Sequence, residues 1–161
     1  MITENTLRVP KVLSQSQKNF YVTEGYLILP KLFSEAEATA LGDDADRVRR
    51  EYADIIHPRN MRSRFKPDFR TGEPLFETFD PIADLSPVAS SVAHDPRIFA
   101  ILHDLFGEPG FLFKDKFIFK PAGAEGASLH QDYVGWKTFP LSFTTVLVAV
   151  DPFTSISGAT A

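Results

Sequence analysis

His130 and Asp132 are the residues whose types and spacing most clearly indicate chemistry. In an extended segment the side chains alternate between two faces, so His130 and Asp132 project from one side while Gln131 faces the other. An imidazole nitrogen and a carboxylate oxygen together suit a borderline divalent metal ion. With a second histidine they form the three-ligand set that leaves positions open on non-haem iron(II). The pair therefore predicts two of three metal ligands.

The same pair has a plainer explanation, in which a histidine on a strand is hydrogen-bonded to a neighbouring carboxylate. A two-residue pattern also arises easily by chance in a chain with four His and 21 acidic residues. What favours a site is the setting, because an aromatic-rich stretch and a Pro/Gly loop at 120–126 lead into the pair and a second β-rich run follows it.

Two predicted strands flank the pair. Residues 111–120 (FLFKDKFIFK) alternate a phenylalanine face, which we expect in the core or against helices, with a face that carries lysines such as Lys116. The lysine face either lies in solvent or lines a cavity that binds a carboxylate. Residues 142–151 are β-branched and almost continuously apolar, which predicts a strand buried on both faces and ended by Pro152.

Helix signals fill much of the chain before residue 107. A short helix is expected to end at Gly25, and the sequence Ser34-Glu35-Ala36-Glu37 is a capping box that predicts the start of a longer one. Apolar residues then recur at spacings of four and three, which predicts one buried stripe on a helix of about twenty residues. The members of this stripe are Leu41, Ala45, Val48, Tyr52 and Ile55.

Shorter elements complete this part of the chain. Ser86-Pro87 and Asp95-Pro96 each place a capping residue before a proline, which predicts two further helices, the second ending at Gly107. Short strands are expected at 26–29 and 75–79. The basic segment at 57–72 is either a solvated loop or a source of cations for an anionic substrate group.

The composition narrows the class of protein. With 161 residues, 43% of them hydrophobic, the chain fits one domain with a sizeable core. Its net charge of −4 disfavours a nucleic-acid partner, and the absence of cysteine excludes disulfides and thiolate sites. The N-terminus lacks the pattern of a signal peptide and no apolar run reaches membrane-spanning length, so we expect no membrane partner and a cytoplasmic protein.

The order of these motifs resembles the phytanoyl-CoA dioxygenase family of iron(II)/2-oxoglutarate-dependent oxygenases. The motifs are GYLILP at 25–30, a helix with an acidic cap, KP at 120–121 and LHQD at 129–132. Nearly the whole chain is covered, and the ordered set is more specific than any one piece.

The resemblance implies an α+β fold in which N-terminal helices pack on a double-stranded β-helix, a jelly-roll or cupin-like core, and the order of predicted helices and strands favours the same class. We expect residues 1–161 to be one oxygenase domain, with a helical front to about 107 and a β-rich metal-site part from about 108. Because the chain stops at a small-residue turn after a strong strand, we also expect truncation on the C-terminal side.

The resemblance further implies Fe(II), 2-oxoglutarate, dioxygen and a small organic substrate. His130 and Asp132 match the family's first two metal ligands, Lys116 and Gln131 are candidates near the cosubstrate, and Trp136 with Tyr133 is a candidate substrate-side wall. Packing in the core remains the alternative role for these two aromatic residues.

Two further features of the family bear on activity. It uses a distal His as third ligand and an Arg for 2-oxoglutarate, and no His or Arg follows Asp132 here, so we expect the 161 residues alone to be inactive. Related halogenating enzymes carry Gly or Ala in place of the Asp, so Asp132 favours hydroxylation or another oxidation. The alternative function is a non-catalytic or other-metal jelly-roll protein that binds a small molecule.

Overall fold

The computed structural model describes residues 12–128, 130–154 and 156–157. These residues form two compact units, one of residues 12–32 with 94–113 and the other of 33–93 with 114–157. Our single-domain expectation, with a division near residue 107, stays a prediction. The N-terminal segment 1–11 and most of the turn at the C-terminus lie outside the described residues.

The first unit contains two helices, α1 (Gln15–Glu24) and α4 (Pro96–Phe106). Both end at a glycine in the left-handed region, Gly25 with φ 79° and Gly107 with φ 72°, as the sequence predicts. The expected strand at 26–29 is wrong: these residues form no strand, and Tyr26 and Ile28 are exposed. A strand requires a neighbouring backbone to pair with, which apolar composition alone does not supply.

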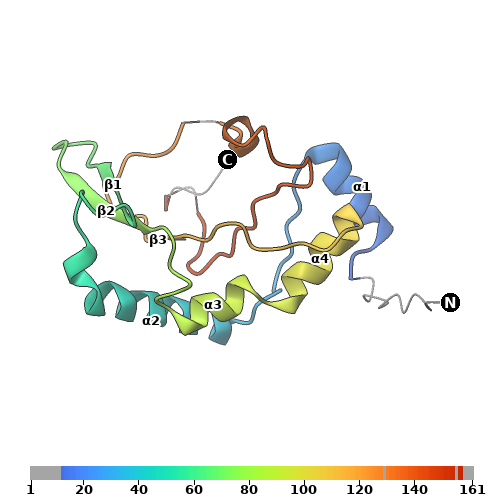
Figure 1. Ribbon diagram of the computed structural model, residues 1–161, viewed down its shortest axis with the longest axis horizontal. Helices are drawn as coiled ribbons and strands as arrows, with labels where there is room; N and C mark the ends of the chain where they lie inside the picture. The colour runs from blue at the N-terminus through green and yellow to red at the C-terminus, as the bar shows by residue number, and fades with distance from the viewer. Residues whose placement is uncertain (1–11, 129, 155, 158–161) are drawn as a thin grey trace. The chain divides into compact units, whose positions relative to one another are not determined.

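The second unit contains α2 (Glu35–Glu51), a 3₁₀ turn (Ala53–Ile55) and α3 (Pro87–Ala93). The predicted capping box is present, since the Ser34 hydroxyl accepts the Glu37 N–H while the Glu37 carboxylate accepts the Ser34 N–H at 2.7 Å. Figure 1 shows α2 and α3 lying close together, and the tertiary contacts pair them. The buried stripe is confirmed, although its last two members lie beyond the end of α2.

A three-stranded antiparallel sheet in the order β1-β2-β3 packs with these helices (Figure 1). Its strands are β1 (Ser63–Pro67), β2 (Pro74–Phe79) and β3 (Phe117–Ile118). β2 matches the strand expected at 75–79, whereas β1 falls in the segment predicted to be irregular. The core is centred on Ala45, Val48 and Phe79, all with 0% exposure. The described chain is therefore α+β.

The two long strands predicted around the His-x-Asp pair form only in part. Within 111–120 only Phe117–Ile118 is a strand, paired with Thr78 and Phe79, while Phe111 belongs to the other unit and is 81% exposed. Residues 142–151 contain no assigned strand. Val148 and Val150 pack against the core whereas Leu147 is 64% exposed, so burial on both faces is wrong. Among the described residues no strand pairs with this segment.

The loop that leads toward His130 is fixed to the turn between β1 and β2. The Phe69 N–H donates to the Gly123 carbonyl at 2.9 Å, and the Glu125 N–H donates to the Pro67 carbonyl at 3.0 Å. Gly123 has φ 90°, and a Cβ there would lie 2.6 Å from Asp68 Oδ2. Only glycine satisfies both the conformation and the close approach.

Candidate functional site

His130 and Asp132 lie next to each other, with His130 Nε2 3.3 Å from Asp132 Oδ1. The other ring nitrogen of His130, Nδ1, is 2.7 Å from the carbonyl oxygen of Ser128. Both side chains are accessible, at 59% and 49% exposure. The structure thus brings together the two residues that the sequence pairs.

The local backbone differs from the predicted strand. Asp132 begins a 3₁₀ turn, Asp132–Gly135, rather than continuing an extended segment after His130. A second contact holds its carboxylate, because the Thr145 hydroxyl donates to Asp132 Oδ2 at 2.8 Å. From its sequence, Thr145 was predicted only to be a β-branched residue of a strand. The one feature that could have indicated this contact is a hydroxyl within an apolar run.

The hydrogen bond to Ser128 determines whether Nε2, the His130 nitrogen that faces Asp132, has a free lone pair. A backbone carbonyl only accepts, so Nδ1 must carry the proton and donate it. In the neutral imidazole, Nε2 then has a lone pair, and it faces a carboxylate oxygen at 3.3 Å. Two acceptors at this distance repel unless positive charge lies between or beside them. The arrangement therefore suits either an imidazolium or a bound cation.

The separation of the two atoms fits a shared metal ion. Ligand atoms each about 2.1 Å from one ion and at right angles to each other are about 3 Å apart. The observed 3.3 Å between Nε2 and Oδ1 is close to that value. An imidazole with its other nitrogen bound to a backbone carbonyl is also the usual state of a histidine ligand. Within the described part of the chain, no group of three or more His, Cys, Asp or Glu forms a full ligand set.

The candidates for the cosubstrate, Lys116 and Gln131, both have exposed side chains. Lys116 immediately precedes β3, and Gln131 lies between the two paired residues. In the described residues, no hydrogen bond or ion pair joins either side chain to His130 or Asp132. Their proximity to a cosubstrate stays a prediction.

Both candidates for the substrate side, Trp136 and Tyr133, contact aromatic residues that follow them in the chain. The ring centroids of Trp136 lie 5.7 Å from Phe139 and 6.1 Å from Phe143. The Tyr133 hydroxyl donates to the Phe139 carbonyl at 3.2 Å. These contacts give the segment after Asp132 a small apolar cluster of its own.

Several cations of the basic segment have structural partners. Arg62 donates to both carboxylate oxygens of Asp84 at 2.5 and 2.8 Å, and this hydrogen bonding holds the pKa of Asp84 below its usual value. Arg64 pairs with Asp80 at 3.7 Å. Lys114, which lies outside the basic segment, pairs with the same carboxylate at 2.9 Å. That one or two cations of this segment meet an anionic substrate group stays a prediction, and Arg62 is bound to Asp84 instead.

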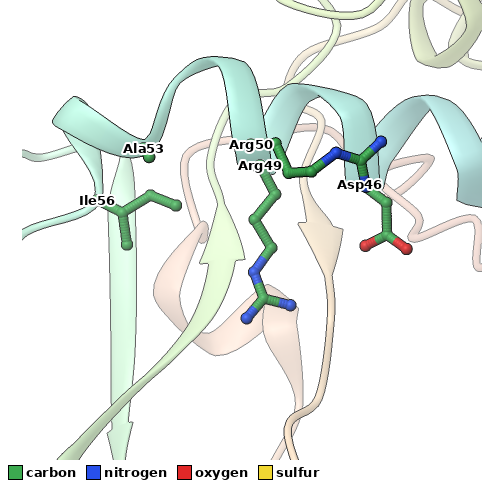
Figure 2. A pocket seen from close by; sticks show the side chains of 5 residues that line it. All are labelled: Asp46, Arg49, Arg50, Ala53 and Ile56. Atoms are coloured by element: carbon green, nitrogen blue, oxygen red, sulfur yellow. The ribbon is translucent and has the colours of Figure 1, made fainter.

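An open hollow on the surface of the second unit lies beside α2 (Figure 2). It has a volume of about 650 Å³ and is lined by Asp46, Arg49, Arg50, Ala53 and Ile56. Figure 2 shows Arg49 extending away from the helix, and its guanidinium lies 5.5 Å from the centre of the Phe119 ring. None of the predicted site residues lines this hollow, so the hollow and the His130–Asp132 pair have no residue in common.

Comparison with known sequences gives a consistent set of matches. A family profile described as phytanoyl-CoA dioxygenase (PhyH) matches residues 21–161. A 2-aminoethylphosphonate dioxygenase of an uncultured bacterium is 27% identical over 86% of this chain and 52% of its own length. Dioxygenase lolE1 of Epichloe uncinata is 27% identical over 91% of this chain and 56% of its own length.

An ectoine dioxygenase of Bordetella bronchiseptica is 26% identical over 77% of this chain and 38% of its own length. The chain thus spans about half the length, or less, of these curated relatives. No solved structure matches it. No helix among the described residues is long and apolar enough to cross a membrane.

Proposed function

The chain belongs to the phytanoyl-CoA dioxygenase family, and on that premise we propose that it is part of an iron(II)/2-oxoglutarate-dependent oxygenase in which His130 and Asp132 hold the iron. The observation that carries this proposal is the pair of acceptor atoms, Nε2 and Oδ1, that face each other at 3.3 Å. The family implies a jelly-roll core, and the α+β fold of the described residues is compatible with it.

The chain's own residues would prepare the metal position. The Ser128 carbonyl keeps the proton on Nδ1, so that Nε2 is available as a ligand, and Asp132 contributes an anionic oxygen. When bound, iron(II) supplies the oxidation in which 2-oxoglutarate and dioxygen become succinate, carbon dioxide and one oxygen atom for the substrate. Lys116 and Gln131 are proposed to lie near the cosubstrate, and Tyr133 and Trp136 near the substrate.

A small organic molecule is the proposed substrate. Two similar proteins are named for acting on 2-aminoethylphosphonate and on ectoine, which are small molecules. An acidic chain with no described membrane-spanning helix is compatible with such a substrate.

Metal binding tests the assignment of the site. Full-length protein should give an anaerobic Fe(II)/2-oxoglutarate absorbance band, and His130→Ala and Asp132→Ala should each remove it, because each deletes a ligand. His57→Ala is a matched control, since it removes an exposed imidazole of the same unit, and in the described residues no hydrogen bond or ion pair joins it to His130 or Asp132. Unchanged absorbance in both site variants would refute the assignment. Metal binding without succinate release on any substrate would favour the binding-protein alternative.

The reaction outcome gives a second test. An intact Asp132 occupies a ligand position that a halide would otherwise take, so hydroxylated or desaturated product is expected even with excess chloride. Mass spectrometry of the products of the full-length protein measures this. A chlorinated product from the wild type would show that the role given to Asp132 is wrong.

A further inference from the structure

We propose that Thr145 is a positioning residue for the metal site, whose hydroxyl fixes the Asp132 carboxylate so that Oδ1 is presented beside His130 Nε2. This inference rests on the proposed function. It adds to the two ligands a residue from a segment thirteen positions further along the chain, for which neither the motif nor the comparisons give a role.

The two oxygens of Asp132 have different partners. Oδ2 accepts the Thr145 hydroxyl at 2.8 Å, while Oδ1 lies 3.3 Å from His130 Nε2. A hydrogen bond to an ionised carboxylate is short, directional and stronger than one between neutral groups. It restricts rotation of the carboxylate, so that the oxygen facing His130 is the one left available to a cation.

The segment that carries Thr145 is itself tied to the folded core. Val148 and Val150 pack against the core cluster, and a Cβ placed on Gly42 of α2 would lie 3.0 Å from a Val150 methyl group. Asp132, by contrast, begins a 3₁₀ turn outside the sheet. The Thr145 hydroxyl therefore connects a ligand on an exposed turn to a segment whose position the core determines.

The Ser128 carbonyl has the corresponding role for the other ligand. It accepts from His130 Nδ1 at 2.7 Å, which orients the ring and directs Nε2 toward Asp132. Each ligand thus has one protein hydrogen bond on the side away from the proposed cation, an arrangement that raises metal affinity at known sites. Because a backbone carbonyl cannot be substituted directly, Thr145 is the partner that mutation can test.

A merely structural role for the contact is disfavoured by exposure. Thr145 is exposed, and the Asp132 side chain is 49% exposed. A hydrogen bond between accessible groups contributes little to folding, because both groups bond to water in the unfolded chain. Its larger effect should be on the geometry of the carboxylate, and hence on metal affinity.

The test compares Thr145→Val, which keeps the shape but removes the hydroxyl, with Thr145→Ser, which keeps the hydroxyl. Thr138→Val is the control, since it makes the same chemical change at another exposed threonine after Asp132. The probe is Mn(II), titrated anaerobically into full-length protein without substrate, with free Mn(II) measured by electron paramagnetic resonance. Thermal melting of the metal-free variants is followed in parallel.

Thr145→Val should weaken Mn(II) binding by about 10–100-fold, the range found for removing a residue that orients a ligand. Thr145→Ser and Thr138→Val should bind within about threefold of wild type, and the metal-free melting temperatures should agree. Equal affinity of Thr145→Val and wild type, or an equal loss in Thr145→Ser, would overturn the role of the hydroxyl while leaving the ligands in place. A wild type that binds no Mn(II) would overturn the proposed function and this inference with it.

Discussion

The core beside α2 and the segment around His130 belong to one unit but are held in different ways. Ala45, Val48 and Phe79 have no exposed surface, and their neighbours are mainly apolar. Among the described residues after Ile101, none is buried, and the contacts of His130 and Asp132 are polar. The comparison indicates that the core beside α2 supplies folding stability, and that side chains around His130 can be substituted at little cost to the fold.

The largest expected effect is in the core. Phe79→Ala should lower the free energy of unfolding by about 3–5 kcal/mol, because it removes a fully buried ring and leaves a cavity. The Phe79 ring centroid lies 4.8 Å from that of Phe76 and 6.0 Å from that of Phe119. Denaturant unfolding measures the loss. Phe69→Ala, at a phenylalanine that is 61% exposed, is the control and should cost less than about 1 kcal/mol.

A buried polar contact should come next. Ser86 has 0% exposure; its hydroxyl accepts the Ala89 N–H at 2.8 Å and donates to the Asp44 carboxylate. Ser86→Ala should cost about 1–3 kcal/mol, since it removes the cap of α3 and leaves buried groups unpaired. Ser34→Ala, at the exposed capping box of α2, should cost about 1 kcal/mol or less. Equal losses in the two variants would show that burial of Ser86 adds nothing.

The Asp44 carboxyl should make the stability of this core depend on pH in the acidic range. Burial by itself raises its pKa, but hydrogen bonds from Arg47 and Ser86 outweigh that effect, and the pKa lies below its ordinary value of 3.8. A lowered folded-state pKa stabilises the fold above the unfolded value and loses that contribution as pH falls through the folded value. Asp44→Asn should therefore be less stable than wild type by about 1 kcal/mol near pH 7.

The difference between Asp44→Asn and wild type should shrink as the pH falls below 3.8, where the wild-type carboxylate becomes protonated. Unfolding midpoints measured over a range of acidic pH test this. A difference that stays constant throughout that range would contradict the role of the ionised carboxylate.

The smallest effect is expected where the chemistry is proposed. In metal-free full-length protein, His130→Ala and Asp132→Ala should each change the free energy of unfolding by less than about 0.5 kcal/mol, because substitutions of accessible side chains have little effect on folding. Thermal melting without metal checks this. A loss of several kcal/mol would remove the contrast between the two regions and make the pair part of the folding core.

The sequence predicted best what neighbouring residues determine. The Ser34–Glu37 capping box and the glycine that ends α4 are local interactions, so their residue types suffice to predict them. The stripe at Leu41, Ala45 and Val48 was also predicted, because one face of a helix repeats at a regular spacing. These features form the stable half of the comparison.

The sequence was a poorer guide where a distant partner is needed. β1 was missed because Arg64, Lys66 and Pro67 resemble a loop, although hydrogen bonding to β2 makes it a strand. Residues 142–151 were predicted to be a strand on composition, yet in the described residues no second strand pairs with them. The contact of Asp44 with Ser86 could not be predicted from local sequence, because the two residues are 42 positions apart.

The candidate site combines both cases, since the pairing of its two residues is local and the contact of Asp132 with Thr145 is not. Two residues apart in sequence, His130 and Asp132 were expected to be neighbours, and they are, although a 3₁₀ turn rather than a strand brings Asp132 to its place. The contacts with Ser128 and Thr145 depend on how the backbone turns, so the residue types did not indicate them.

The bonded loop at 123–125 also acts as a short tether. Glu125 is held to Pro67 of β1, and only five peptide links separate it from His130. Because an extended chain spans about 3.3–3.6 Å per residue, His130 cannot lie more than about 18 Å from Glu125 in any arrangement of the protein. The hydrogen bonds to Pro67 and Phe69 thus limit the region that His130 can occupy. Lengthening the loop between Glu125 and His130 would enlarge that region without altering any ligand.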